Sequence, residues 1–368
     1  MKKLILVTLV LCMALSACTK AEVGKAPTAE SAAASSVEST ASGGKSAASE
    51  VSLPEKTKTA AHVTKTLSSG VMVDTGVYVP ESMQQQNLPE MRGTGQEIDF
   101  EKIKEIFCAG KKITEETEGS YPPDMPGALT EAEKHLSTED GDYLLVGCGN
   151  SFFYTAARDT QDTSNLELYK TGKDLDFATI AEADEEIRKV AEELGISVGD
   201  SVCYTIDTSS MPHYIFQYDL LVNGMPLGKF DGGSYSDNVF TPGTYLTAVL
   251  DEDGIRHFDV SYVLKETETG DAQRVLTLDE ALDKVDEKYN SIIMEGDYYI
   301  NDIQMAYMPI KTDDAGIVRL IPVWYFQTTH QILLPDKSGT GEIMLPQDGY
   351  ILINALDGTE LLHENGDI

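Results

Sequence analysis

The chain has 368 residues, and its 28 Lys and Arg against 61 Asp and Glu give a formal net charge of −33. This charge would repel nucleic acid and anionic lipid surfaces, and the sequence has no basic cluster to offset it. Composition therefore argues against nucleic acid and anionic lipid as partners, and it predicts a well-solvated surface.

The N-terminus is typical of a lipoprotein signal peptide, predicted at 1–17. Two lysines precede an uncharged apolar stretch at 4–15, which is shorter than the about 20 apolar residues that a membrane-spanning helix needs. The Leu-Ser-Ala-Cys sequence at 15–18 then resembles the lipobox of bacterial lipoproteins. The resemblance implies that Cys18 carries a diacylglyceryl group with palmitate-type chains. An ordinary signal peptide cleaved after Ala17 is the alternative.

A disordered tether is predicted behind the lipidated cysteine, at 18–57. Ala, Ser, Thr, Glu, Gly and Lys dominate it, and so few large apolar side chains cannot offset the entropy lost on ordering. A flexible coil of about 40 residues spans about 30 to 40 Å root-mean-square. We therefore expect the folded part at the extracytoplasmic face of the cell membrane, with the membrane as a partner only through the lipid on Cys18.

The next segment, 58–170, is predicted to be an N-terminal α+β subdomain. Runs at 62–67 and 71–79 are typical of a strand pair, and a short helix is expected from Phe100 to Cys108. Two short apolar runs around a Gly-rich turn indicate a tight hairpin at 143–155.

The clearest helical pattern, at 177–194, opens a first α+β unit predicted at 171–270. Its apolar residues fall on one helical face while acids crowd the other, and Gly195 follows as a stop signal. Antiparallel strands are expected after it at 201–206, 213–222, 245–250 and 255–263.

The same order of elements recurs about 100 residues later, in a second unit predicted at 271–368. Thr277 and Glu280 have capping-box spacing and begin a helix. Strands are expected after it at 298–307, 317–327, 332–334, 350–356 and 359–362. The predicted fold class is therefore α+β, with duplicated units of one helix packed on an antiparallel sheet, plus the N-terminal subdomain.

Three short stretches carry a family resemblance: the helix start at 278–282, a central strand at 320–326, and the strand and turn at 353–358. With them, the segment 277–362 resembles a PepSY-type domain, and 175–265 resembles one more loosely. The pair of units resembles the extracytoplasmic regulators YycH and YycI, which restrain a cell-wall-stress sensor kinase, and uncharacterised lipoproteins of Gram-positive bacteria. Those regulators are usually held by a transmembrane helix, whereas lipid is predicted to hold this chain.

Three cysteines lie beyond the lipobox, at Cys108, Cys148 and Cys203, and none belongs to a CxxC motif. Zinc ribbons and thioredoxin-like redox chemistry are therefore not supported. Cys148 and Cys203 have apolar, strand-like surroundings and are interpreted as small buried hydrophobes. A disulfide between two of the three is left open.

No catalytic, metal, cofactor or ligand-binding residue is predicted. The six histidines include no HExxH and no pair at metal-ligand spacing. The acidic turn at 251–254 has Val249 and Val260 where a calcium loop needs polar ligands, so a solvated hairpin turn is favoured. The segment 232–236 has a serine where a nucleophile elbow needs its last glycine.

Consecutive aromatic residues, Trp324, Tyr325 and Phe326, lie in a predicted strand. Alternation sends the first and third to one face, where they form either a ligand cradle or sheet core. Sheet core is favoured, because the helix starting at Leu278 needs a sheet face to cover.

These observations predict a non-catalytic binding or regulatory module with a protein or peptide partner in the envelope. The resemblance implies a sensor kinase as that partner, and an envelope enzyme is the other candidate. Two alternatives remain. An envelope hydrolase would need two carboxylates converging in a pocket with perturbed pKa values, and a lipid or small-ligand carrier would need an apolar cavity of about 300 Å³ or more.

Overall fold

The computed structural model describes residues 61–120, 129–130, 132–158, 172–207, 211–228, 244–292, 296–312, 314, 316–335 and 342–361. All of them belong to one compact unit, Val51–Ile368. The predicted signal peptide, Cys18 and the tether lie outside the described residues.

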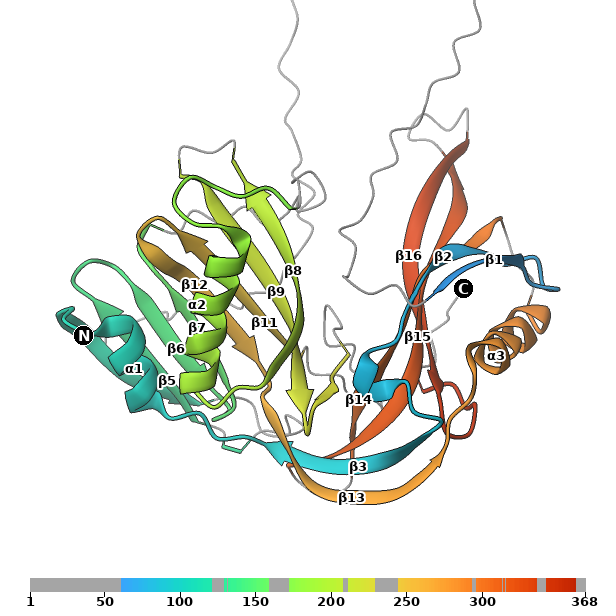
Figure 1. The fold of residues 1–368 in the computed structure, drawn as a ribbon, viewed down its shortest axis with the longest axis horizontal. Coiled ribbons are helices and arrows are strands. Elements are labelled where there is room, and N and C mark those ends of the chain that lie inside the picture. The colour runs from blue at the N-terminus through green and yellow to red at the C-terminus, as the bar shows by residue number, and fades with distance from the viewer. Residues whose placement is uncertain are drawn as a thin grey trace, which may run out of the picture. The chain divides into compact units, whose positions relative to one another are not determined.

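One sheet has seven strands in the order β1-β2-β14-β15-β3-β13, and β16 also pairs with β15 (Figure 1). Neighbouring strands are antiparallel except β2 and β14, which are parallel. The strands are β1 Ala61–Thr66, β2 Met72–Tyr78, β3 Asn87–Gly95, β13 Leu264–Arg274, β14 Tyr298–Lys311, β15 Ile317–Pro335 and β16 Glu342–Asn354.

The second sheet has nine strands in the order β10-β9-β11-β12-β7-β6-β5-β4, and β8 also pairs with β9. All of its pairings are antiparallel. The strands are β4 Ile113–Ser120, β5 Ala132–Thr138, β6 Tyr143–Gly147, β7 Ser151–Thr155, β8 Val198–Ile206, β9 His213–Val222, β10 Met225–Pro226, β11 Tyr245–Asp251 and β12 Gly254–Ser261.

Three α-helices occur in the described ranges, with the 3-10 helix η1 Glu81–Met83: α1 Phe100–Cys108, α2 Ile180–Glu193 and α3 Leu278–Asn290. Each begins after a side-chain cap, Asp99 for α1, Thr179 for α2 and Thr277 for α3, because the first amides of a helix lack intrahelical partners. The described helices include none that is both long and apolar enough to span a membrane.

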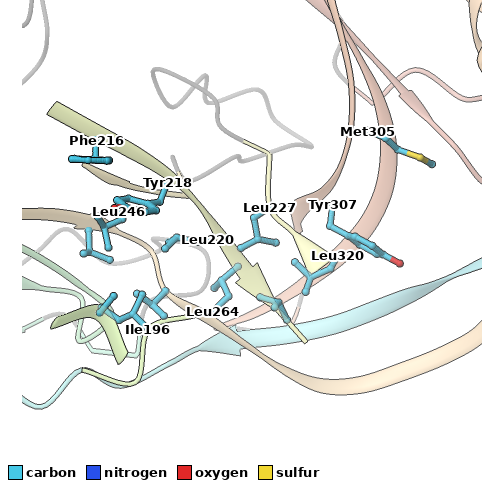
Figure 2. Packing of buried hydrophobic residues seen from close by; sticks show 14 of the residues in the cluster. Ile196, Phe216, Tyr218, Leu220, Leu227, Leu246, Leu264, Met305, Tyr307 and Leu320 are labelled. Carbon is cyan, nitrogen blue, oxygen red and sulfur yellow. The ribbon is translucent and has the colours of Figure 1, made fainter. Parts of the chain in front are cut away.

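Apolar side chains from both sheets join in one buried cluster. Figure 2 shows it running from Phe216 and Tyr218 through Leu220 and Leu227 to Tyr307. A backbone β-bridge between Leu227 and Tyr307 links the two sheets at the same place. Burial of this apolar surface is the main force that holds the two sheets together.

The predicted α+β class with duplicated helix-on-sheet units is wrong. The structure is mostly β, with two large sheets and few helices. Strands at 61–95 join the sheet of β14 to β16, whereas strands at 113–155 join the sheet of β8 to β12. Periodicity identifies a strand but not its partner in a distant part of the chain. The domain boundaries near 170 and 270 stay predictions.

Candidate functional site

A hollow of about 640 Å³ lies beside the first turns of α2 and is open to solvent. Carboxylates, hydroxyls and a thiol line it together with a few apolar groups. They come from α2, from the segment before it, and from β8 and β9 (Figure 1). The lining residues are Asp174, Thr179, Ile180, Ala181, Asp184, Ser201, Cys203 and Phe216.

Carboxylates occupy the amides at the start of α2, which therefore do not offer an anion site. The Thr179 hydroxyl accepts from the Glu182 amide at 3.2 Å, and the Glu182 carboxylate accepts from the Thr179 amide at 2.8 Å. Asp174 Oδ1 accepts from the Ile180 amide at 2.9 Å. The two full carboxylate charges of Asp174 and Glu182 outweigh the partial positive charge of the helix N-terminus, so this end of the hollow is negatively charged.

Asp184 is held in one position from three directions. Its Oδ1 accepts from the Tyr218 hydroxyl at 2.8 Å and from the Ser201 hydroxyl at 3.3 Å, and its Oδ2 accepts from Arg188 Nε at 2.7 Å. The Arg188 guanidinium also lies over the Tyr218 ring and donates to the Gly199 carbonyl. This network ties α2 to β8 and β9 with a charged carboxylate at its centre.

The Cys203 thiol lines the hollow together with Asp174 and Asp184. Burial raises its pKa to about 12, and the charges of Asp184 and Asp174 add to the effect because they oppose a thiolate. The thiol therefore stays protonated at neutral pH and is a poor nucleophile.

A second hollow, of about 180 Å³, lies where the end of β2 meets β8 and β9. Tyr78, Asp200 and Asp219 are its titratable lining groups besides Glu81. The Tyr78 hydroxyl donates to Asp200 Oδ2 at 2.6 Å, and burial raises the Tyr78 pKa above its ordinary value. This hydrogen bond joins the two sheets, so we interpret the smaller hollow as structural.

A part-buried ion pair, with Asp142 buried and Lys111 partly exposed, lies among α1, β6 and β7. Lys111 Nζ contacts Asp142 and donates to the Tyr154 hydroxyl at 3.1 Å. The Ala157 amide donates to Asp142 Oδ1 at 2.8 Å. Burial opposes ionisation of Asp142, but these hydrogen bonds hold its pKa below the usual value. The pair fastens the segment after β7 and is assigned to stability.

The histidines that the structure describes do not converge on a metal site. Five of the six lie in the described ranges, and His363 does not. The five described are His62, His135, His213, His257 and His330. His62 contacts Asp74, and His330 stacks on Tyr298. The described residues hold no group of three or more His, Cys, Asp or Glu side chains that could bind a metal ion.

Two other predicted features are structural. The turn at 251–254 closes the hairpin of β11 and β12, and Asp251 in it pairs with Arg158. Trp324 and Phe326 are buried in the core, and Trp324 Nε1 donates to the Leu276 carbonyl at 2.9 Å. The prediction of sheet core is confirmed. Cys108, Cys148 and Cys203 are free, with Cys108 and Cys148 buried.

Sequence reasoning missed the hollow beside α2. Asp184 and Arg188 have the i, i+4 spacing of an ordinary helix ion pair, which gives no sign of Ser201 and Tyr218. Their meeting depends on the position of α2 on the sheet. No local pattern contains that information.

Comparisons with known proteins identify a structure with a similar fold, but they provide no information about activity. No family model matches the chain, and no curated protein matches it. A solved structure of an uncharacterised protein from Eubacterium rectale has a TM-score of 0.64 and 17% identity, covering 80% of this chain and 91% of that one. At this identity the likeness establishes the fold alone. The resemblance to PepSY-type domains stays a prediction.

Proposed function

We propose that this chain is a membrane-anchored extracytoplasmic lipoprotein that acts as a non-catalytic binding or regulatory module. It holds a protein or peptide partner in the envelope through the hollow beside α2. The observation that carries the proposal is the fixed, negatively charged lining of this open hollow, with Asp184 bound by Tyr218, Ser201 and Arg188.

Such a lining favours recognition over catalysis. A general acid or base must be free to contact a substrate and pass a proton to or from it, whereas three donors already contact the Asp184 carboxylate and hold it in place. The thiol of Cys203 is protonated at neutral pH. Polar groups held in fixed positions are what a binding site needs for specificity.

The open form of the hollow favours a macromolecular partner over a carried lipid. A carrier encloses most of an apolar ligand in a cavity, and here Asp174, Asp184 and Ser201 stand at an open surface. The predicted lipid on Cys18 and the tether would keep this surface near other membrane proteins. A sensor kinase is the kind of partner that the sequence resemblance suggests, and an envelope enzyme is the other candidate.

Crosslinking in intact cells followed by affinity capture tests this role. Wild-type protein is compared with Cys18→Ala, which removes the predicted anchor. We expect a reproducible partner from the wild type and loss of that partner from Cys18→Ala. Failure of both forms to capture any specific protein, with equal expression, would overturn the proposal.

A further inference from the structure

Strand β8 is an edge of the nine-stranded sheet, because β9 is its only partner among the described strands. Two hydrogen bonds show which backbone groups of β9 are directed toward β8. The Leu221 amide donates to the Ser197 carbonyl at 2.9 Å, on the side of β8. The Leu227 amide donates to the Leu220 carbonyl, on the opposite side.

Alternation along antiparallel strands then places the backbone groups of β8. Gln217 faces β8, like Leu221, and lies opposite Val202. Val202 therefore exchanges its hydrogen bonds with β9, and the neighbouring Ser201 and Cys203 direct their N–H and C=O groups outward. Both residues are partly exposed, and no backbone group in the described ranges pairs with them on that side.

The usual protection of an edge strand covers only the first part of β8. Proteins guard edge strands with charges, prolines or bulges, and the opposite edge of the same sheet, β4, carries three exposed glutamates. In β8 the register shifts between Val198 and Ser201, and the one acid of the strand, Asp200, lies in that stretch. There the Arg188 guanidinium also donates a hydrogen bond to the Gly199 carbonyl at 2.9 Å. From Ser201 to Cys203 the strand has no proline and no charged residue, and no described backbone group pairs with its outward side.

The hollow lies on the face where an added strand would place alternate side chains. A residue directly opposite Cys203 would share its face of the sheet, and Cys203 lines the hollow with Asp174 and Asp184. Asp174 uses Oδ1 for the Ile180 amide, so its Oδ2 remains able to accept. Asp184 is already paired with Arg188, so a positively charged side chain would complement Asp174, which forms no ion pair among the described residues. The net charge of −33 also attracts basic segments at longer range.

We propose that β8 is a docking edge for an extended basic peptide segment, which pairs with Ser201 and Cys203 as an additional strand. A lysine or arginine of that segment enters the hollow between Asp174 and Asp184. The backbone hydrogen bonds supply affinity and the hollow supplies specificity, as in other complexes formed by strand addition. This inference rests on the proposed function and names the partner class for the same site.

Peptide binding to the purified full-length chain in detergent tests the inference. The probe is a fluorescein-labelled heptapeptide, Thr-Val-Thr-Lys-Thr-Val-Thr, with blocked ends, followed by fluorescence anisotropy. One reference peptide has Glu in place of Lys. The other keeps Lys but has alternate backbone nitrogens methylated, which removes its donors. We expect saturable binding of the Lys peptide and at least about tenfold weaker binding of both references.

A substitution in the protein tests the role of the hollow. Asp174→Asn keeps an acceptor for the Ile180 amide but removes the charge, and should weaken the Lys peptide about tenfold. Asp283→Asn, on the exposed face of α3, is the matched control and should change nothing. Equal affinity for the Lys and Glu peptides, or unchanged binding by Asp174→Asn, would overturn the role of the hollow.

Hydrogen exchange locates the bound peptide without any mutation. Bound Lys peptide should slow exchange at the amides of Ser201 and Cys203 and leave Val202 unchanged, since Val202 is already bonded to β9. Protection elsewhere with none at these two amides would refute the docking edge. A concentration-dependent dimer that protects them without peptide would place a second copy of the chain there and refute the peptide.

Failure of the docking-edge inference can be distinguished from failure of the proposed function. If a partner is crosslinked in cells equally by wild type and Asp174→Asn, the binding role stands and the basic-peptide inference fails. If the Lys peptide binds as described but no envelope partner is ever captured, the docking edge stands and the proposed cellular role fails.

Discussion

The Tyr218 hydroxyl donates a hydrogen bond to Asp184 Oδ1 at 2.8 Å, across the interface between β9 and α2. Tyr218 is fully buried, and burial together with the Asp184 charge raises its pKa above the ordinary value. The tyrosine therefore stays protonated and acts as a permanent donor. It fixes the carboxylate at the wall of the hollow, so the shape of the site depends on a core residue.

Tyr218→Phe should lower the free energy of unfolding by about 1 to 3 kcal/mol, because a buried hydrogen bond to a charged group is lost. Urea denaturation of the full chain measures the change. Tyr299→Phe is the control, since its hydroxyl contacts Asp297 at the exposed surface, and it should have little effect. Equal stabilities for Tyr218→Phe and wild type would contradict the importance of this bond.

The part-buried pair of Lys111 and Asp142 predicts a non-additive response. Lys111→Met should cost about 1 to 3 kcal/mol, because it leaves the buried Asp142 carboxylate without its cationic partner. The double variant Lys111→Met with Asp142→Asn should be less destabilised than Lys111→Met alone. Additive losses in a double-mutant cycle would show that the pair does not act as a unit.

Proline substitutions should separate the two sides of β8. Val202→Pro removes an amide that bonds to β9 and should destabilise the fold by about 3 kcal/mol or more. Cys203→Pro removes an outward amide, a position that edge strands tolerate, and should cost less. Thermal unfolding of both variants gives the comparison. If Cys203→Pro proved the more damaging, the assigned direction of these amides would be wrong.

Stability at acidic pH should depend on Asp286. Burial opposes its ionisation, but hydrogen bonds from Ser68 and Ser69 hold its pKa at about 2, below the ordinary 3.8. A lowered pKa in the folded state stabilises the protein above pH 3.8, and this contribution is lost as pH falls towards 2. Asp286→Asn should therefore be less stable than wild type at pH 7, with the difference shrinking below pH 3.8. A pH-independent difference would argue against this link between the β1–β2 turn and α3.

Cys203 should make the protein less stable as the pH rises into the alkaline range, whereas Asp286 makes it less stable as the pH falls. Its folded pKa of about 12 lies above the ordinary 9.0, so the folded state keeps a proton that the unfolded chain releases. The contribution is complete below pH 9 and declines as pH rises towards 12. The stability of wild type relative to Cys203→Ala should therefore fall over this range. A constant difference would contradict the raised pKa.

Local structure was predictable where a short pattern determines it. The helix Phe100–Cys108 was predicted with the bounds observed, and the capping box of Thr277 and Glu280 is confirmed. The hairpin at 143–155 is also confirmed. In each case a cap, a turn or a periodic run lies within a few residues of the element it specifies.

Sheet membership was not predictable from the same patterns. Val73 of β2 pairs with Ile300 of β14, more than two hundred positions away. Both strands have strand-like composition, and nothing in either segment identifies the other. The duplicated-unit interpretation assumed that each helix covers strands next to it in sequence. It is wrong because strands far apart in the chain pair with each other in both sheets. The hollow was missed for the same reason, because Asp184 and Ser201 come from separately predicted elements.

Site-specific photo-crosslinking in intact cells can show whether the hollow beside α2 and the edge of β8 hold a partner in the envelope. Benzoylphenylalanine is placed at Ala181, an exposed residue of the hollow, and at Thr117 in the opposite edge strand β4 as control. We expect one reproducible adduct from position 181 and none from position 117. Absence of an adduct at 181, or equal adducts from both positions, would contradict the proposed binding site.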